Sequence, residues 1–459
     1  MKVLIHLIIF LIASITFGQE TVQELTYDAF IDRVMQHHPT AYRASLVKET
    51  GDASVLSARG QFDPKVFGDL NQKYFKNTQY YSQAQGGIKI PTWFGVSAEA
   101  GYEVNDGVYL NPQNRTPDAG LWYAGLRLEL GQGLIIDKRR AEFEKAKVFR
   151  QGTELEQRML LNELNRDASF AYWKWNQSYQ KVKLYEDALQ NAQIRFEGIK
   201  NTAAFGDRPH IDTVEAFIVV QNRSVSLSQA RLSFENAELN LEIYLWDQGF
   251  IPLELEGKIP PRKELVADQS MLVSPLDSLI ENHPYLQLNA LKLKQKEIDL
   301  RLKREQLKPK LTLKYNAISE PVGSNPLAEY SPANYTWGAS FSYALLSRKE
   351  RGNVQLAKLK IQDQKLSNAL TEVQVDYKIN AALNNYLQSI EQLSILRQLV
   401  ENNELLYEAE KSLFDMGESS VFMINSRESK LLKAQIEFIE TQNKVLMLKS
   451  EFDYSLMFL

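Results

Sequence analysis

The sequence predicts a mainly α-helical protein with a smaller β component, built twice from one pattern of elements. Three observations lead to this fold class. The chain repeats itself at long range, two long stretches without proline have helical periodicity, and segments of alternating polarity precede both stretches. Each copy is therefore predicted to contain, in order, a helix, strands, a very long helix and a final helix.

The first 18 residues, MKVLIHLIIFLIASITFG, have the pattern of a secretory signal peptide. Lys2 precedes an apolar run, and small and polar residues follow as far as Gly18, after which we expect cleavage. The run is short for a membrane-spanning helix of ~20 residues. No later stretch is long and apolar enough to span as a helix. We therefore expect an exported protein without a helical membrane anchor.

Composition argues against several functional classes. The 53 Lys and Arg residues nearly balance the 57 Asp and Glu residues, which disfavours nucleic acid as the main partner. There is no cysteine, which excludes disulfides, thiolate metal sites and cysteine nucleophiles. The sequence contains no Gly-rich phosphate loop, nucleophile elbow or HExxH motif, so we expect no enzyme activity and no cofactor.

An internal duplication organises the chain. The pair His38-Pro39 recurs as His283-Pro284 at a separation of 245 residues. Later landmarks recur at separations of 215 and 211 residues, because the first copy is longer by 30 residues after Pro64 and by four in Gly131–Ile136. The landmarks are Trp122 with Trp337 and Gly206 with Gly417.

The duplication predicts four segments. These are a signal peptide at 1–18, a first repeat at 19–246, a proline-rich joint at 247–275 and a second repeat at 276–459. A residue before proline is driven away from the α region, so His38 and His283 each predict a bend early in their copy. A metal role for these histidines is disfavoured, because no other ligand-type residue recurs near them.

Very long helices are predicted at about 137–204 and 347–416, each followed by a glycine, which helix C-termini favour. About 70 residues of helix extend roughly 100 Å, so these helices must lie along other long helices. Shorter helices are predicted at about 210–246 and 421–457. The second long helix carries a heptad-like apolar seam, which includes Leu366, Leu370, Val373 and Tyr377.

The beginnings of the long helices also carry signals. Asp137 is a predicted N-cap, and Ser347 with Glu350 has the pattern of a capping box. Basic residues follow at once, as in Lys138-Arg139-Arg140. These residues either form a solvated face or contact lipid headgroups at a membrane edge.

Segments with alternating polarity precede the long helices, as in WYAGLRLELG and KLTLKY. A soluble sandwich has the same period, but aromatic residues at the segment ends favour a membrane barrel. Two strands per copy, with two more from the insertion, are too few to close a barrel, so other subunits must pair the edges. The insertion reads as a hairpin turning near Pro91–Gly95, which either widens the barrel or caps its mouth.

These features resemble the TolC-like outer-membrane efflux proteins. The resemblance rests on LTYDAFIDRVMQHHPTAYRA and its echo PLDSLIENHPYLQLNA, on LGQGLIIDKRRAEFEKAK, and on the two helix-ending glycines. It covers essentially the whole mature chain, and the order of elements carries it more than any single motif.

The resemblance implies a homotrimer in the outer membrane of a Gram-negative cell. Three subunits would close one β-barrel and pack their helices into a tunnel across the periplasm. A periplasmic adaptor and an inner-membrane pump would dock on the tunnel, as in tripartite efflux or type I secretion. Substrates would pass without covalent change, and drugs, metals and proteins all remain open as cargo. The alternative is a periplasmic coiled-coil scaffold or adaptor without a pore.

The resemblance also directs attention to the helical tip. Some family members constrict it with aspartates six and nine residues after the second turn glycine, where this chain has Met423 and Ser426. The first copy instead has Asp212 and Glu215 at these distances from its glycine. Three subunits would place six such carboxylates near the pore mouth, which favours cations, although acidic residues in a first helical turn also suit the helix dipole.

The turns themselves are predicted to contact an adaptor. The residues expected to do so are Gly206, Asp415, Gly417 and Glu418.

Overall fold

The computed structural model describes residues 24–261, 280–323, 325 and 327–457. The predicted signal peptide and residues 262–275 of the predicted joint lie outside these ranges. The chain divides into two compact units. Of the described residues, the sheet unit comprises those in 45–157 and 281–374, and the helical unit comprises those in 24–44, 158–280 and 375–457.

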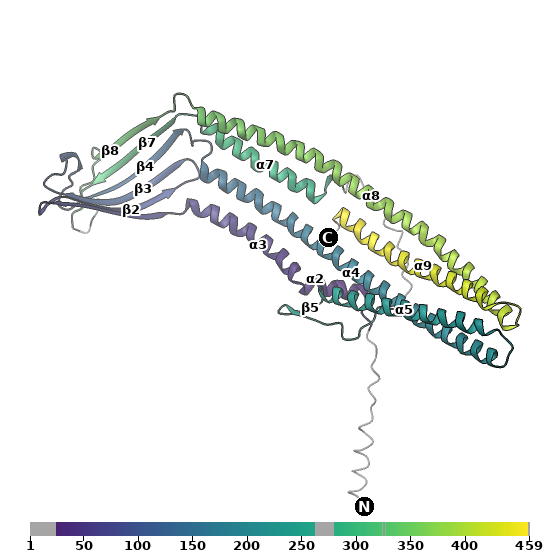
Figure 1. Cartoon of the computed structure of the whole chain (residues 1–459). Coiled ribbons are helices and arrows are strands. Elements are labelled where there is room, and N and C mark those ends of the chain that lie inside the picture. The colour runs from purple at the N-terminus through teal and green to yellow at the C-terminus, as the bar shows by residue number, and fades with distance from the viewer. Residues whose placement is uncertain (1–23, 262–279, 324, 326, 458–459) are drawn as a thin grey trace, which may run out of the picture. The chain divides into compact units, whose positions relative to one another are not determined.

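One antiparallel sheet of six strands dominates the sheet unit, in the order β1-β2-β3-β4-β7-β8 (Figure 1). The predicted hairpin in the insertion is present, because β2 and β3 are joined by a short turn after Pro91. The strands are β1 (Lys65–Phe75), β2 (Thr78–Pro91), β3 (Val96–Asp106), β4 (Leu121–Gly131), β7 (Lys310–Ser319) and β8 (Tyr335–Ser342).

The two faces of this sheet differ sharply in polarity. In register across the strands, the charged residues share one face, which we call the polar face; the exception is Asp106 at the end of β3. The polar face includes Lys65, Asp69, Lys89, Glu99, Glu103, Arg127, Glu129, Lys310 and Lys314. The opposite, apolar face exposes large side chains, including Val66, Leu70, Leu126, Trp337 and Phe341.

Ion pairs connect neighbouring strands on the polar face. Glu99 of β3 forms ion pairs with Lys314 of β7 and with Arg127 of β4, the latter at 3.7 Å. Its side chain is only 7% exposed even though it lies on a sheet surface. These contacts tie three strands together across the centre of the sheet.

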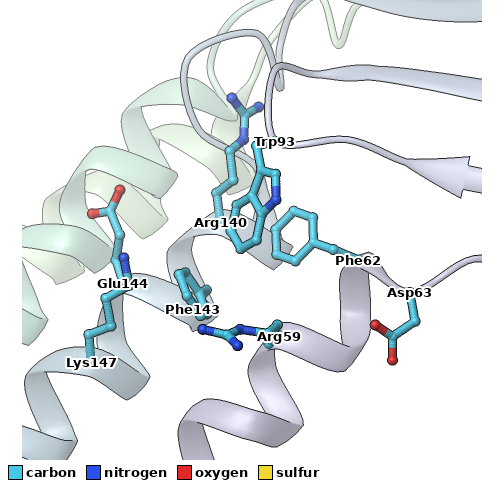
Figure 2. Close-up of a pocket in the computed structure, with 8 residues that line it drawn as sticks. All are labelled: Arg59, Phe62, Asp63, Trp93, Arg140, Phe143, Glu144 and Lys147. Atoms are coloured by element: carbon cyan, nitrogen blue, oxygen red, sulfur yellow. The ribbon is translucent and has the colours of Figure 1, made fainter.

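Helices in the sheet unit pack by small apolar clusters. One cluster joins α4 (Lys138–Ala204) to α7 (Pro284–Glu305) through Val148, Ile298 and Leu302. Another joins α4 to α3 (Pro39–Arg59) and to the short 3-10 turn after it, through Ala58, Phe62 and Phe143. Trp93, in the turn between β2 and β3, stacks on Phe62 with ring centroids 3.8 Å apart (Figure 2).

The loop before α4 is held by polar contacts. Asp137 is the N-cap, as predicted, because its Oδ1 accepts the Arg140 amide at 2.9 Å. The Arg140 guanidinium in turn donates to the carbonyls of Gly133, Leu134 and Ile135. Arg139 pairs with Asp137 at 3.0 Å. Both arginines are therefore engaged within the chain.

Helix α8 (Arg348–Asp415) begins differently from the prediction. Ser347 has a positive φ of 43°, and its hydroxyl donates to the Ala344 carbonyl at 2.6 Å. The predicted capping box with Glu350 is therefore wrong, because the serine side chain is directed back toward the preceding turn.

Both His-Pro pairs cap the helix that follows them. His38 and His283 have extended backbones, with ψ of 136° and 131°. The Nδ1 of His38 accepts the Thr40 amide at 3.1 Å, and that of His283 accepts the Tyr285 amide at 3.3 Å. The bend expected before each proline is confirmed, with the imidazole as the cap.

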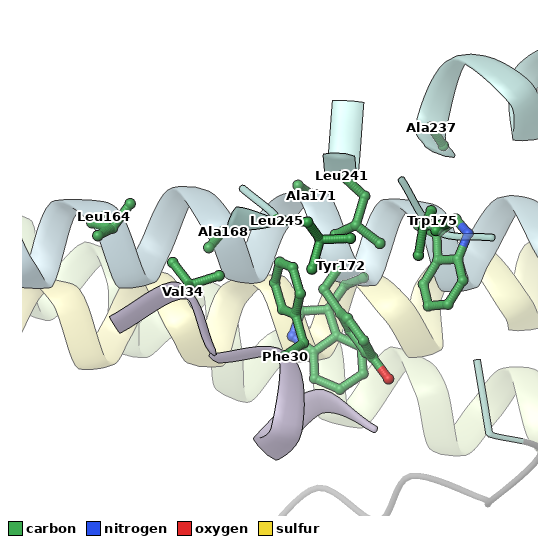
Figure 3. Packing of buried hydrophobic residues seen from close by; sticks show 12 residues of the cluster. Phe30, Val34, Leu164, Ala168, Ala171, Tyr172, Trp175, Ala237, Leu241 and Leu245 are labelled. Atoms are coloured by element: carbon green, nitrogen blue, oxygen red, sulfur yellow. The ribbon is translucent and has the colours of Figure 1, made fainter. Parts of the chain in front are cut away.

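The helical unit contains the main apolar core (Figure 3). Phe30 and Val34 of α2 (Tyr27–His37) pack against Tyr172 and Trp175 of α4 and Leu241 of α5 (His210–Glu242). These five side chains are at most 1% exposed. A fully buried aromatic or aliphatic side chain contributes about 1.5–3 kcal/mol, so this cluster is a main source of stability for the unit.

The start of the described chain is attached to this core. The Tyr172 hydroxyl donates to the Leu25 carbonyl at 2.7 Å, and the Leu25 amide donates to the Ile259 carbonyl at 3.0 Å. Tyr27 stacks on Trp173, with ring centroids 4.6 Å apart. The segment before α2 is thereby fixed on two sides.

Helix α5 ends earlier than predicted. It stops at Glu242 rather than Trp246, because Trp246-Asp247 forms the short strand β5, which pairs with β6 (Ile251–Pro252). The remaining helix, α9, spans Val421–Leu456. Within the described ranges, none of the helices combines the length and hydropathy needed to cross a bilayer.

Candidate functional site: the helical tip

The two turns that join the helices of the helical unit have the same backbone geometry. Gly206, between α4 and α5, has φ of 86°, and Gly417, between α8 and α9, has φ of 81°. The Gly206 amide donates to the Ala203 carbonyl, and the Asp207 amide donates to the Thr202 carbonyl. The corresponding bonds form after α8, so both turns are Schellman motifs that satisfy the last helical carbonyls.

Large apolar side chains are exposed at these turns. Phe205 and Met416, which immediately precede the two glycines, are 85% and 65% exposed. Ile211 and Phe422, at the starts of the following helices, are 70% and 66% exposed. Asp415 and Glu418 are also exposed, so the tip presents apolar and acidic groups together.

The carboxylates predicted to line the tip lie on α5 but are not equivalent. Asp212 forms an ion pair with Arg208 at 3.9 Å, and the Arg208 guanidinium lies 4.4 Å from the Phe414 ring. Glu215 is half-buried and has no salt bridge within the described part of the chain. An acidic group whose charge is already paired contributes less to a pore field, which leaves Glu215 as the stronger candidate.

Met423 and Ser426 occupy the first turns of α9. The Met423 amide donates to the Ser420 hydroxyl at 3.2 Å, so Ser420 is the N-cap of α9. Met423 is 38% exposed and Ser426 is half-buried. Neither residue carries a charge, so α9 brings no acidic group to these two positions.

A buried polar network joins three of the helices that the two turns connect. Arg195 of α4 donates to both carboxylate oxygens of Glu428 on α9, at 2.7 Å and 3.1 Å. The same guanidinium donates to Asn425 at 2.9 Å and to the Tyr407 hydroxyl of α8 at 3.2 Å. One arginine therefore links three helices of the unit.

The electrostatics of this network follow from its burial. Desolvation alone would lower the pKa of Arg195, but the ionised Glu428 raises it above its ordinary value. Arg223 of α5 also faces Glu428, and burial lowers the pKa of Arg223. Burial also raises the pKa of the Tyr407 hydroxyl, which stays protonated. The network is thus centred on the ionised Arg195–Glu428 pair, and its buried surroundings disfavour any charge that lacks a partner.

A second ion pair fixes the turn between α8 and α9. Glu410 of α8 lies 3.5 Å from the Arg427 Nε of α9 and accepts the Ser419 hydroxyl from the turn itself. Glu410 is only 9% exposed. The position of this turn is therefore set by side chains on both flanking helices.

Sequence reasoning missed the Arg195–Glu428 pair, although the sequence contains a signal for it. Arg195 falls between the buried residues Ala192 and Ile199 at helical spacing. Glu428 falls in the buried stripe of α9 between Ile424 and Leu431. A charged residue inside an apolar stripe on each of two helices indicates a buried pair.

The described residues include no group of three or more His, Asp or Glu side chains placed to hold a metal ion. His38 and His283, which were considered above, use Nδ1 as helix caps.

One family model matches part of the second half of the chain. Residues 276–447 match the model of the outer membrane efflux protein family. No curated protein matches the chain.

Solved structures with the same fold cover nearly the whole chain. The CmeC outer membrane channel of Campylobacter jejuni is 15% identical with a TM-score of 0.67, covering 94% of this chain and 85% of its own. VceC of Vibrio cholerae is 14% identical with a TM-score of 0.67, covering 94% and 95%. The MtrE outer membrane channel of Neisseria gonorrhoeae is 13% identical with a TM-score of 0.66, covering 93% and 88%. At these identities the likeness establishes the fold.

Proposed function

We propose that this chain, whose residues 276–447 match the model of the outer membrane efflux protein family, is a subunit of an outer-membrane exit channel. Its fold is that of solved outer-membrane channels. In such a channel, substrates pass through the pore without covalent change. The channel lies in the outer membrane and extends into the periplasm.

The two-faced sheet is the observation that carries this proposal. Its apolar face exposes Val66, Leu126 and Phe341 at 84%, 56% and 71%, which is costly in water but suits hydrocarbon. Its polar face carries the charges, as the wall of an aqueous lumen does. Strands β1 and β8 each pair on one side only in the described chain. A membrane sheet cannot leave such edges open, so other copies must pair them.

The long helices carry matching evidence for assembly. On α8, Leu366, Val373 and Tyr377 of the predicted seam are 67%, 67% and 72% exposed. On α5, apolar residues recur every seven positions and are at least half exposed; they are Ile218, Val225, Leu232 and Leu239. Heptad-spaced apolar positions pack against other helices. Three copies would cover these seams and form a tunnel.

The tip is the proposed docking end for a periplasmic adaptor and an inner-membrane pump. The two Schellman turns present Phe205 and Met416, with Asp415 and Glu418 beside the latter. Exposed apolar groups flanked by charges are typical of interaction sites. Gly206 and Gly417 set the geometry of both turns. Asp212 and Glu215 are proposed to line the pore mouth inside this surface.

A periplasmic coiled-coil scaffold is the rival function, and fractionation separates the two. The channel is expected in outer membranes and should resist extraction with urea, because its apolar face contacts lipid. A scaffold would be released from the same membranes. A matched variant with two charges on the apolar face, Leu126→Arg with Phe341→Arg, should lose membrane insertion, while Arg127→Gln on the polar face should retain it.

Conductance provides the direct test of the pore. The purified protein is expected to form discrete ion-conducting channels in planar bilayers and to migrate as a trimer in detergent. A stable monomer without conductance, released by urea, would overturn the proposed function.

A further inference from the structure

We infer that the β2–β3 hairpin forms two strands of the membrane-spanning wall, so that three subunits close a barrel of eighteen strands. Each subunit contributes six strands to one sheet. Without the hairpin, four strands per subunit would close a barrel of twelve. This inference rests on the proposed trimeric channel and concerns the width of its outer exit.

Pairing on both sides places the hairpin within the wall. β2 pairs with β1 from Lys65↔Lys89 to Phe75↔Thr78, and β3 pairs with β4 from Val96↔Leu128 to Glu103↔Leu121. The hairpin therefore separates β1 from β4 along nearly their whole length. A hairpin that only capped the mouth would leave β1 and β4 to pair with each other.

The hairpin also repeats the two faces of the sheet. Lys89 and its register partner Glu99 lie on the polar face, and Glu99 is paired with residues of β4 and β7. The neighbouring positions Ile88 and Ile90 lie on the apolar face and are 36% and 40% exposed. A segment outside the membrane would have no reason to keep an apolar face in register with the lipid-facing residues of β4.

A close contact fits the hairpin to β4. Gly87 of β2 and Gly101 of β3 are register partners, and the Tyr123 side chain of β4 lies beside Gly101. A Cβ on Gly101 would lie 2.6 Å from the Tyr123 hydroxyl oxygen, and one on Gly87 would collide with the Ala100 carbonyl. The absence of a side chain at Gly101 leaves room for this aromatic ring on the polar face.

The turn of the hairpin is anchored at the helical end of the sheet. Trp93 contacts both Phe62 and Phe143, with ring centroids 3.8 Å and 4.8 Å away, beside a pocket of about 680 Å³ (Figure 2). The next residue, Phe94, is 79% exposed, as expected for an aromatic side chain at a membrane interface. The Glu129 amide donates to the Gly95 carbonyl at 3.4 Å. The turn is thus held by the 3-10 turn that follows α3, by α4 and by β4.

The physical consequence is a wider exit. With strands ~4.8 Å apart and tilted by ~40°, eighteen strands enclose a backbone cylinder about 36 Å across, against about 24 Å for twelve. Barrels of this strand number leave an aqueous channel. The substrate class that fits this exit is therefore bulkier than one that a twelve-stranded exit admits.

Cysteine labelling tests the placement, and the chain has no native cysteine to interfere. Gln85→Cys and Glu103→Cys lie on the polar face as register partners, and Ala84→Cys and Val104→Cys lie on the apolar face. In outer membranes, a water-soluble maleimide is expected to label the first pair at least tenfold faster than the second. Equal labelling at the two pairs, whether fast or slow, would overturn the inference.

Control positions on β7 separate this inference from the proposed function. Thr312→Cys and Leu313→Cys lie on the polar and apolar faces of a strand outside the hairpin. Alternation on β7 without alternation on β2 and β3 would refute the hairpin placement alone. Loss of alternation at both would refute the channel itself.

Deletion of the hairpin gives an independent readout. Removing residues 78–120 joins the end of β1 to the start of β4 through the existing turn at Lys76-Asn77. If the variant assembles, electron microscopy is expected to show a β-ring narrower by about one third, following the strand count. A ring of unchanged diameter would contradict the inference; if the variant fails to assemble, the labelling experiment decides.

Discussion

Arg195 of α4 and Glu428 of α9 form a bidentate ion pair, with N–O distances of 2.7 Å and 3.1 Å and side chains only 10% and 8% exposed. Desolvation makes such a pair costly to assemble and far more costly to break from one side. The Tyr407 hydroxyl and the Asn425 carbonyl oxygen accept further hydrogen bonds from the same guanidinium. The relative position of the tip helices therefore depends on both partners being present.

Glu428→Gln is expected to destabilise the helical unit by about 3–5 kcal/mol, because it leaves a buried guanidinium without its counter-charge. Thermal unfolding and protease cleavage near the tip would both report the change. Glu197→Gln is the matched control, since Glu197 pairs with Lys200 at 3.2 Å on an exposed surface of α4. Exposed pairs contribute at most about 1 kcal/mol. Equal stability of the two variants would show that the buried pair is not structurally important.

Glu215→Gln is expected to reduce the cation preference of the pore more than Asp212→Asn. Arg208 already pairs with Asp212, so removing that carboxylate changes the local field less. Reversal potentials in planar bilayers under a salt gradient would measure the preference. Glu418→Gln, in the turn between α8 and α9, serves as the control. Unchanged selectivity in Glu215→Gln would remove this residue from the pore.

Gly206→Ala and Gly417→Ala are each expected to cost about 1–2 kcal/mol, because both residues hold a left-handed backbone. No atom lies within 4 Å of a Cβ added at either position, so the backbone strain acts alone. Gly198→Ala provides a control of opposite sign. Gly198 is exposed within α4 and equally unobstructed, so alanine there should stabilise by about 0.5–1 kcal/mol. A stabilising effect at the turns would contradict the Schellman assignment.

Glu305 predicts acid sensitivity of the loop before α4. Burial would raise its pKa, but Lys308 at 2.7 Å and the Ile135 amide at 3.1 Å lower it overall. Because the folded-state pKa lies below that of the unfolded chain, the stabilisation is complete above the ordinary glutamate value of ~4.3. It is lost as the pH falls through the lowered folded-state pKa.

The expected outcome is that Glu305→Gln flattens the dependence of stability on pH in this acidic range and costs about 1 kcal/mol at neutral pH. Thermal unfolding across the range would measure both effects. Glu297→Gln, on the exposed surface of α7, should leave the profile unchanged. A profile in Glu305→Gln identical to that of the unmodified protein would assign the acid sensitivity elsewhere.

The helices could be predicted because their signals are local. The long proline-free stretches gave α4 and α8 to within one residue at each end, and Asp137 caps α4 as its residue type suggests. Prediction failed where another local hydrogen-bonding arrangement competes with helix propensity. The stretch after Glu242 has helical composition, but Trp246 pairs with Pro252 instead. Ser347 has a capping sequence, yet its backbone has a positive φ, because its amide donates to the Ala344 carbonyl and closes the preceding turn.

The site was predicted less completely, because its contacts depend on how the turns and helices pack in three dimensions. The glycine turns and the acidic residues of α5 can be located by counting along the sequence from the repeat. The partner of Asp212 is only four residues away, yet the pairing depends on how the turn after Gly206 folds. The Arg195–Glu428 pair joins residues 233 positions apart, so only the three-dimensional packing of α4 and α9 reveals it.

The β2–β3 hairpin is a self-contained module between β1 and β4. It enters and leaves the sheet at the end opposite Trp93, and the pairing of β4 with β7 does not involve it. The width of the proposed exit and the structure of the long helices are therefore encoded in separate stretches of the sequence. A lineage could change the width of the exit by gaining or losing this one module, while the sequence of the helical tip stays the same.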